Sequence, residues 1–165
     1  MKTLKIFLVL ILFSATAAKA QFTKAELQVS GLTCSMCSKA TEKSLRTLGF
    51  IDDIKADLNR NVFVISFKKN TPVNFSQISK KVENAGFFVN NLKATFNFSG
   101  IKVDNNSFDY SGDTFRLVNA DNRTLAGPVT ITVVDKGFAP ASVYKKYNAT
   151  VGNNPAAGHV YHVAI

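Results

Sequence analysis

The chain has 165 residues, enough for one medium-sized domain or two small ones, and 46% of them are hydrophobic. Its formal net charge is +9, but the lysines are scattered, with no basic run of five or more. This pattern predicts a solvated basic surface and argues against nucleic acid as a partner.

The N-terminal segment, residues 1–20, is predicted to be a secretory signal peptide. Lys2 and Lys5 provide a positive start, and residues 6–13 form an uninterrupted apolar run. Ala-Lys-Ala at 18–20 has the small-x-small pattern of a cleavage site, which places the mature N-terminus at Gln21. The apolar run is much shorter than the ~20 residues that a membrane span needs. We therefore expect an exported protein, periplasmic or secreted, with no membrane span.

Residues 25–67 are predicted to form a strand, a helix and a hairpin. Residues 25–29 alternate between apolar and polar side chains, which is typical of a half-buried strand. A helix follows and is expected to end at Gly49. Strands are then expected at 54–58 and 62–67, joined by a tight turn at Asn59 and Arg60. The first helix is expected to bury a stripe of residues at helical spacing: Cys37, Ala40, Leu45 and Leu48.

A second helix and a fourth strand complete this half of the chain. Asn74, with Gln77 three residues later, is a variant of the capping box and marks the start of the helix. Gly86 marks its end, and residues 88–95 return as a strand. The buried stripe of this helix is expected to be Phe75, Ile78, Val82 and Ala85.

The element order βαββαβ predicts an α+β fold, a ferredoxin-like split-βαβ sandwich over residues 21–95. Two helices would then cover one face of a four-stranded antiparallel sheet. From residue 96 onward the helical period disappears, and short strands are expected near 96–98, 114–119, 129–133 and 160–165, separated by turn residues. Residues 96–165 are therefore predicted to form a small all-β barrel or sandwich domain, whose role the sequence does not indicate.

The only two cysteines, Cys34 and Cys37, are the strongest functional signal. A disulfide across two intervening residues closes a very short loop and gains little chain entropy, so the pair is better suited to holding an ion or exchanging electrons. The pair lies where the first strand meets the first helix, and the helix N-terminus there stabilises thiolates. Two neighbouring thiolates suit a soft ion, Cu(I) foremost.

The motif Gly-Leu-Thr-Cys-Ser-Met-Cys at residues 31–37, with βαββαβ around it, resembles the heavy-metal-associated domain family. That family includes copper chaperones, the N-terminal modules of copper-pumping ATPases and periplasmic mercury-binding proteins. The resemblance implies that Cys34 and Cys37 bind the metal, with Hg(II) or Ag(I) as alternatives to Cu(I). It also implies transfer to a metal-transporting protein or another metal-binding domain.

One position departs from the family pattern, and another is expected to shield the site. Leu32 stands where the family has methionine, a swap that nearly conserves volume. Phe87 occupies the family's aromatic or lysine position near the metal loop. Zinc-preferring relatives carry an acid beside the cysteines, whereas Thr33 and Ser35 provide none, which disfavours Zn(II).

The main alternative is a thiol-disulfide oxidoreductase that uses the same cysteine pair. The chain has no tryptophan before the motif, and Pro72 precedes a helix rather than a strand, so a protein that is not an enzyme is favoured. Three other side chains are weaker metal-ligand candidates. Met36 is expected to point away from the pair. His159 and His162 are expected on opposite faces of a strand, because side chains alternate along strands.

Overall fold

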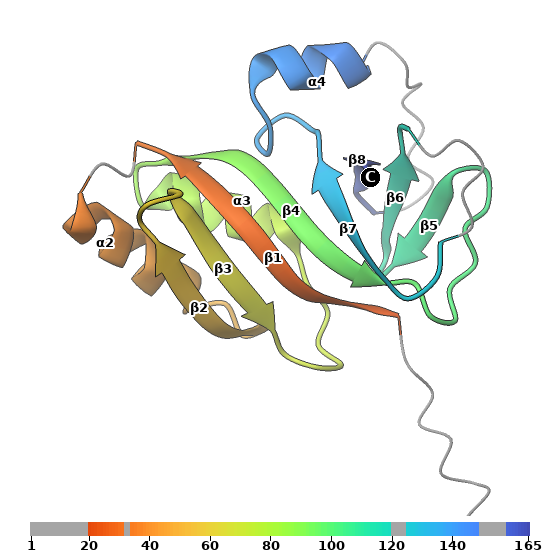
Figure 1. The fold of residues 1–165 in the computed structure, drawn as a ribbon, viewed down its shortest axis with the longest axis horizontal. Helices are drawn as coiled ribbons and strands as arrows, with labels where there is room; N and C mark the ends of the chain where they lie inside the picture. The colour runs from red at the N-terminus through yellow and green to blue at the C-terminus, as the bar shows by residue number, and fades with distance from the viewer. Residues whose placement is uncertain (1–19, 32–33, 120–124, 149–157) are drawn as a thin grey trace, which may run out of the picture.

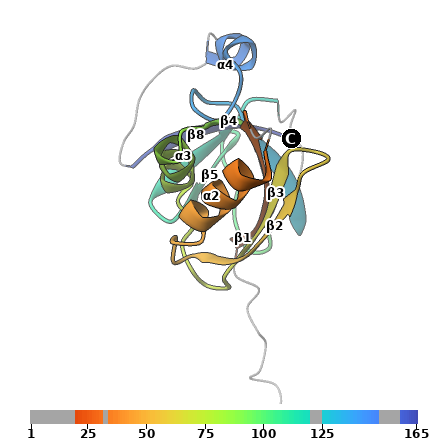
Figure 2. The ribbon, with the colours of Figure 1, turned by 90° about the vertical axis from the view of Figure 1, so that its left-hand side faces the viewer.

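A computed structural model describes residues 20–31, 34–119, 125–148 and 158–165. Its strands form one eight-stranded sheet in the order β2-β3-β1-β4-β7-β8-β6-β5. Helices α2 (Ser35–Leu45) and α3 (Phe75–Asn84) cover one face of this sheet (Figures 1 and 2). None of the described helices has the length and hydropathy needed to cross a bilayer.

The first four strands form the predicted ferredoxin-like sandwich. They are β1 (Gln21–Ser30), β2 (Ile51–Asp57), β3 (Val62–Phe67) and β4 (Phe88–Asn97). β1 lies between β3 and β4, and all three pairings are antiparallel. The hairpin turn between β2 and β3 is held by Asp57, whose Oδ1 accepts hydrogen bonds from the backbone N–H groups of Asn59 and Arg60. The βαββαβ order and the turn are therefore confirmed.

The buried stripe of α2 differs from the predicted one. Ala40 is exposed and Cys37 is only half-buried, whereas Leu45 and Leu48 are buried as predicted. Ser38 and Thr41 are buried in addition. A buried threonine is tolerated here because its hydroxyl donates a hydrogen bond to the backbone oxygen of Cys37 at 3.1 Å. A small polar side chain on a helix can thus face the protein core when the helix backbone supplies its hydrogen-bond partner. The helix also ends at Leu45, before Gly49, with Arg46 as its C-cap.

Helix α3 begins and ends as the sequence indicated. The side chain of Asn74 accepts a hydrogen bond from the backbone N–H of Gln77 at 2.9 Å, and Gly86 follows the helix with φ +86°. Glycine is favoured in that left-handed conformation because it has no Cβ. Phe75, Ile78 and Val82 are buried as expected, whereas Ala85 is only half-buried and Ser79 is buried as well.

The strands of the C-terminal half extend the first sheet instead of closing a barrel of their own. β7 (Pro128–Val133) pairs antiparallel with β4 over six residues, from Leu92↔Val133 to Asn97↔Pro128. β8 (Val160–Ala164) follows, then β6 (Asp113–Leu117) and β5 (Ser107–Tyr110). In a four-stranded sandwich β4 would be an edge strand with unpaired backbone groups, and β7 satisfies them.

Two elements of this half were not predicted. β5 has four residues, too few for a clear alternating pattern. Helix α4 (Ala141–Asn148) lies apart from α2 and α3 and has only eight residues, about two turns, which is too short for its period to be recognised from sequence (Figure 1).

One hydrophobic core joins both halves. The ring of Phe22 lies 4.7 Å from those of Phe75 and Phe96, and 5.4 Å from that of Phe115 on β6. Phe115 in turn stacks on Tyr161 of β8 at 5.1 Å. All five of these side chains are at most 1% exposed. The C-terminal strands therefore complete the packing of β1 and α3.

Replacing Gly158 by alanine should destabilise the protein by roughly 2–4 kcal/mol, because the new Cβ would overlap the backbone oxygen of Gly112. Gly137 is a matched control, since its φ of +88° resembles the +83° of Gly158, while its nearest neighbour would be 3.7 Å away. Gly137→Ala should therefore cost only the backbone strain, about 1–2 kcal/mol. Urea denaturation of both variants measures the difference, and equal losses would contradict the close approach at Gly158.

Tyr161→Phe should lower the stability by about 1 kcal/mol and change its pH dependence. The Tyr161 hydroxyl accepts from the backbone N–H of Ser76 at 3.1 Å and lies 2.7 Å from the Ser76 hydroxyl. Burial raises the pKa of Tyr161 above its ordinary 10.0. The unfolded chain therefore loses the Tyr161 hydroxyl proton at a lower pH than the folded chain does. The stabilisation that this hydroxyl provides is complete below pH 10 and falls as the pH rises through the folded-state pKa. Unfolding free energies between pH 8 and 11 should fall less steeply in the variant, and identical slopes would contradict this role.

Candidate metal centre

The cysteine pair lies at the junction of β1 and α2, as predicted. β1 ends at Ser30 and Gly31 turns the chain with φ +83°. Leu32 and Thr33 lie outside the described residues. Cys34 is the N-cap of α2, with extended backbone angles of φ −131° and ψ 150°, and Cys37 lies in the first turn. The fold thus places one cysteine in the loop and the other on the helix.

Hydrogen bonds fix both cysteines to the start of the helix. The Sγ of Cys34 accepts from the backbone N–H of Cys37 at 3.1 Å, the position that a serine or aspartate oxygen takes in an ordinary N-cap. The backbone oxygen of Cys34 accepts from the N–H of Ser38 at 3.1 Å. This capping role of Cys34 could not be predicted from the sequence, because cysteine is not among the usual N-cap residues. An N–H aimed at sulfur favours the thiolate over the thiol.

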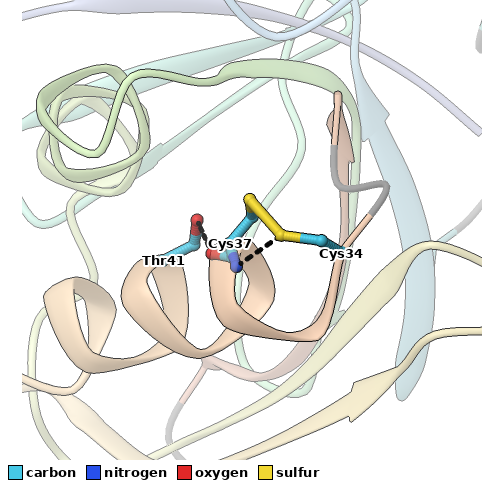
Figure 3. Close-up of a disulfide and its surroundings, with 3 residues drawn as sticks. All are labelled: Cys34, Cys37 and Thr41. Carbon is cyan, nitrogen blue, oxygen red and sulfur yellow. Dashed lines mark hydrogen bonds between the residues drawn. A yellow bond between two sulfur atoms is a disulfide. The ribbon is translucent and has the colours of Figure 1, made fainter.

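A disulfide joins Cys34 to Cys37, with 5.4 Å between the two Cα atoms (Figure 3). Cys34 is exposed, whereas Cys37 is half-buried and packs against the core. In the reduced state the two sulfurs would therefore differ in access, and Cys34 would be the one that a partner or an ion meets first.

The first turn of α2, which carries Cys37, contains no acidic residue. A Cβ built on Gly31 would lie 3.6 Å from the ring of Phe87, so Phe87 packs beside the loop, as predicted. Met36 is 82% exposed and Phe88 is 69% exposed. Over the described residues, no group of three or more His, Cys, Asp or Glu side chains could hold a metal ion. The pair thus offers sulfur ligands without a neighbouring carboxylate.

His162 lies on β8 and His159 directly precedes it, and each side chain contacts another residue of the C-terminal half. His162 Nδ1 lies 2.6 Å from Asp135 Oδ1, and the other oxygen of Asp135 accepts from the backbone N–H of His162. The ring of His159 lies 4.3 Å from that of Tyr161. The structure therefore brings Cys34 and Cys37 together but does not bring the histidines into one site.

The chain is similar to known proteins over its N-terminal half. The heavy-metal-associated domain model matches residues 26–88. The CopZ metallochaperone is 22% identical, with 41% of this chain and 98% of that chain covered and a TM-score of 0.38. The copper binding domain of HMA7, a P-type ATPase, is 29% identical, with 39% and 86% covered and a TM-score of 0.36.

The yeast copper transporter domain Ccc2a is 25% identical, with 41% of this chain and 90% of that chain covered and a TM-score of 0.36. The comparison with curated proteins found no match. The family model spans the cysteine loop, both helices that cover the sheet and the start of β4. Residues 26–88 of this chain therefore match the heavy-metal-associated domain family.

Proposed function

We propose that the chain is an exported metal-binding protein that holds one soft ion, Cu(I) foremost, between the thiolates of Cys34 and Cys37. The observation that carries this proposal is the position of the pair, on an exposed loop at the N-terminus of α2 within a heavy-metal-associated domain. The ion is cargo, which the protein sequesters or transfers to a metal-transporting protein or another metal-binding domain.

The ligand chemistry supports a soft ion. Thiolates prefer Cu(I), and two of them satisfy an ion that accepts two-coordinate binding. Ag(I) and Hg(II) share this preference and should substitute for Cu(I). Zn(II) prefers four ligands, which the described residues around the pair do not supply.

The exposure of the site supports transfer. Because Cys34 is exposed and Cys37 is half-buried, an incoming thiolate can reach the ion from the Cys34 side. Met36 and Phe88 are both largely exposed, and Phe88 pairs with Ser30 at the end of β1 that leads into the loop. Exposed apolar side chains beside a binding site are the contacts that a docking partner would bury.

A thiol-disulfide oxidoreductase is the second candidate, and the disulfide between Cys34 and Cys37 favours it. The exposed Cys34 at a helix N-terminus would be the attacking thiolate in such an exchange. Catalysis of insulin reduction by the reduced protein would support this reading. Stoichiometric uptake of Cu(I) with no such catalysis supports the metal-binding proposal.

Titration of the reduced protein with Cu(I) against a competing chelator tests the proposal. Binding should saturate near one equivalent, because the two thiolates form one site. Cys34→Ser and Cys37→Ser should each weaken Cu(I) binding by ~1000-fold or more. A tenfold loss of affinity corresponds to about 1.4 kcal/mol, and the loss of a metal–thiolate bond costs several times that amount.

Met36→Ala is the matched control, because Met36 lies between the cysteines and is 82% exposed. Its affinity for Cu(I) should equal that of the unchanged chain. Tight binding by the Cys34→Ser, Cys37→Ser double variant would show that Met36, His159 or His162 holds the ion, and the proposal would fail.

A further inference from the structure

A small pocket borders the residue at which the mature chain is predicted to begin. Its volume is about 240 Å³, and its walls include Ala20, Gln21, Pro72 and Tyr110. The walls come from the start of β1, the segment before α3, and the end of β5. Cleavage after Ala20 would place the α-nitrogen of Gln21 at this pocket.

Gln21 is already part of the folded structure. It pairs with Asn97 at the end of the β1–β4 ladder, and its Oε1 accepts a hydrogen bond from the backbone N–H of Asn70 at 2.9 Å. The next residue, Phe22, is only 1% exposed. The new N-terminus would therefore lie against the protein and not at the end of a free tail.

We propose that Gln21 of the mature protein is cyclised to pyroglutamate. The α-amino nitrogen attacks the side-chain carbon Cδ, an amide bond forms between them, and the bond from Cδ to the side-chain nitrogen breaks. That nitrogen takes up a proton from the attacking amine and leaves as ammonia. The reaction needs no oxidant or reductant. It rests on the proposed export, because only cleavage after Ala20 gives Gln21 a free amine.

The pocket favours the cyclised form over the free amine. The rings of Pro72 and Tyr110 supply apolar walls to the pocket. An α-ammonium at this wall would lose part of its hydration, whereas the lactam carries no charge. The lactam also keeps a carbonyl oxygen on Cδ as an acceptor for a backbone N–H such as that of Asn70.

Intact mass spectrometry of the protein purified from its own exported compartment, after reduction of the disulfide, tests this. The expected mass is that of residues 21–165 less about 17 Da, the mass of ammonia. Gln21→Ala, processed at the same site, should show the full mass and react with amine labels at its N-terminus, whereas the unchanged chain should not.

A chain that begins at Gln21 with its full mass would overturn the cyclisation and leave the export intact. A chain that begins at another processed residue would overturn the cyclisation and the predicted cleavage site, and a chain that keeps residues 1–20 would overturn the proposed export as well. Neither result depends on Cu(I) binding, so the metal-binding proposal stands or falls separately through its titration.

Discussion

A chain that ends after Phe98 should lose most of its stability at 25 °C, although it keeps the whole heavy-metal-associated domain. Phe22, Phe75 and Phe96 are at most 1% exposed in the full chain, and each packs against rings from β5, β6 or β8. Re-exposing an aromatic side chain costs about 1.5–3 kcal/mol. Together with the unpaired edge of β4, the loss approaches the roughly 5–15 kcal/mol of a typical domain.

Thermal and urea unfolding of residues 21–98 and of residues 21–165, followed by circular dichroism, measure this loss. Phe115→Ala tests the same contact in the full chain and should cost about 3–5 kcal/mol, because the ring is 1% exposed. Leu58→Ala is its control and should change the stability by no more than about 0.5 kcal/mol, since Leu58 is 52% exposed. A fragment with the same unfolding midpoint as the full chain would contradict a shared core.

Oxidation of the cysteine pair should abolish Cu(I) binding. In the reduced chain both sulfurs can bind the ion as thiolates, whereas in the disulfide each sulfur is bonded to the other and carries no charge. The loss should equal that of the Cys34→Ser, Cys37→Ser variant, at least ~1000-fold in affinity, since about 4 kcal/mol of metal–sulfur bonding corresponds to that factor.

The measurement is a Cu(I) titration of one preparation before and after reduction, with free thiols counted at each step. The double serine variant is the control, because its binding should not respond to reductant. Equal affinity of the oxidised and reduced chains would mean that the ion binds elsewhere.

The N-terminal half could be predicted from its sequence because its signals are local. Asn74 and Gly86 mark the ends of α3 through their own backbone chemistry, and both assignments are confirmed. Cys34 and Cys37 could likewise be placed at a strand–helix junction, where the structure has them. Ala40 was wrongly assigned to the core because it is apolar. Thr41 is buried in its place, since its hydroxyl forms a hydrogen bond within the helix, and apolar character alone does not indicate this.

The C-terminal half could be predicted only as strands. The succession of short strands and turns does not indicate which strands pair, and the ladder between β4 and β7 joins residues that lie 31 to 41 positions apart in the sequence. The contacts of Phe115 and Tyr161 with Phe22 and Phe75 are equally non-local. The predicted division at residue 95 falls within β4, two residues before that strand ends.

The central claim is that Cys34 and Cys37 act as a metal clamp in the compartment to which we propose that the chain is exported. Alkylation mass spectrometry of the protein recovered from that compartment, with and without copper in the medium, counts its free thiols directly. We expect a disulfide in the absence of copper that mild reductant opens, and two thiols protected by the metal in its presence. A pair that is fully oxidised under both conditions, and that mild reductant fails to open, would contradict the claim.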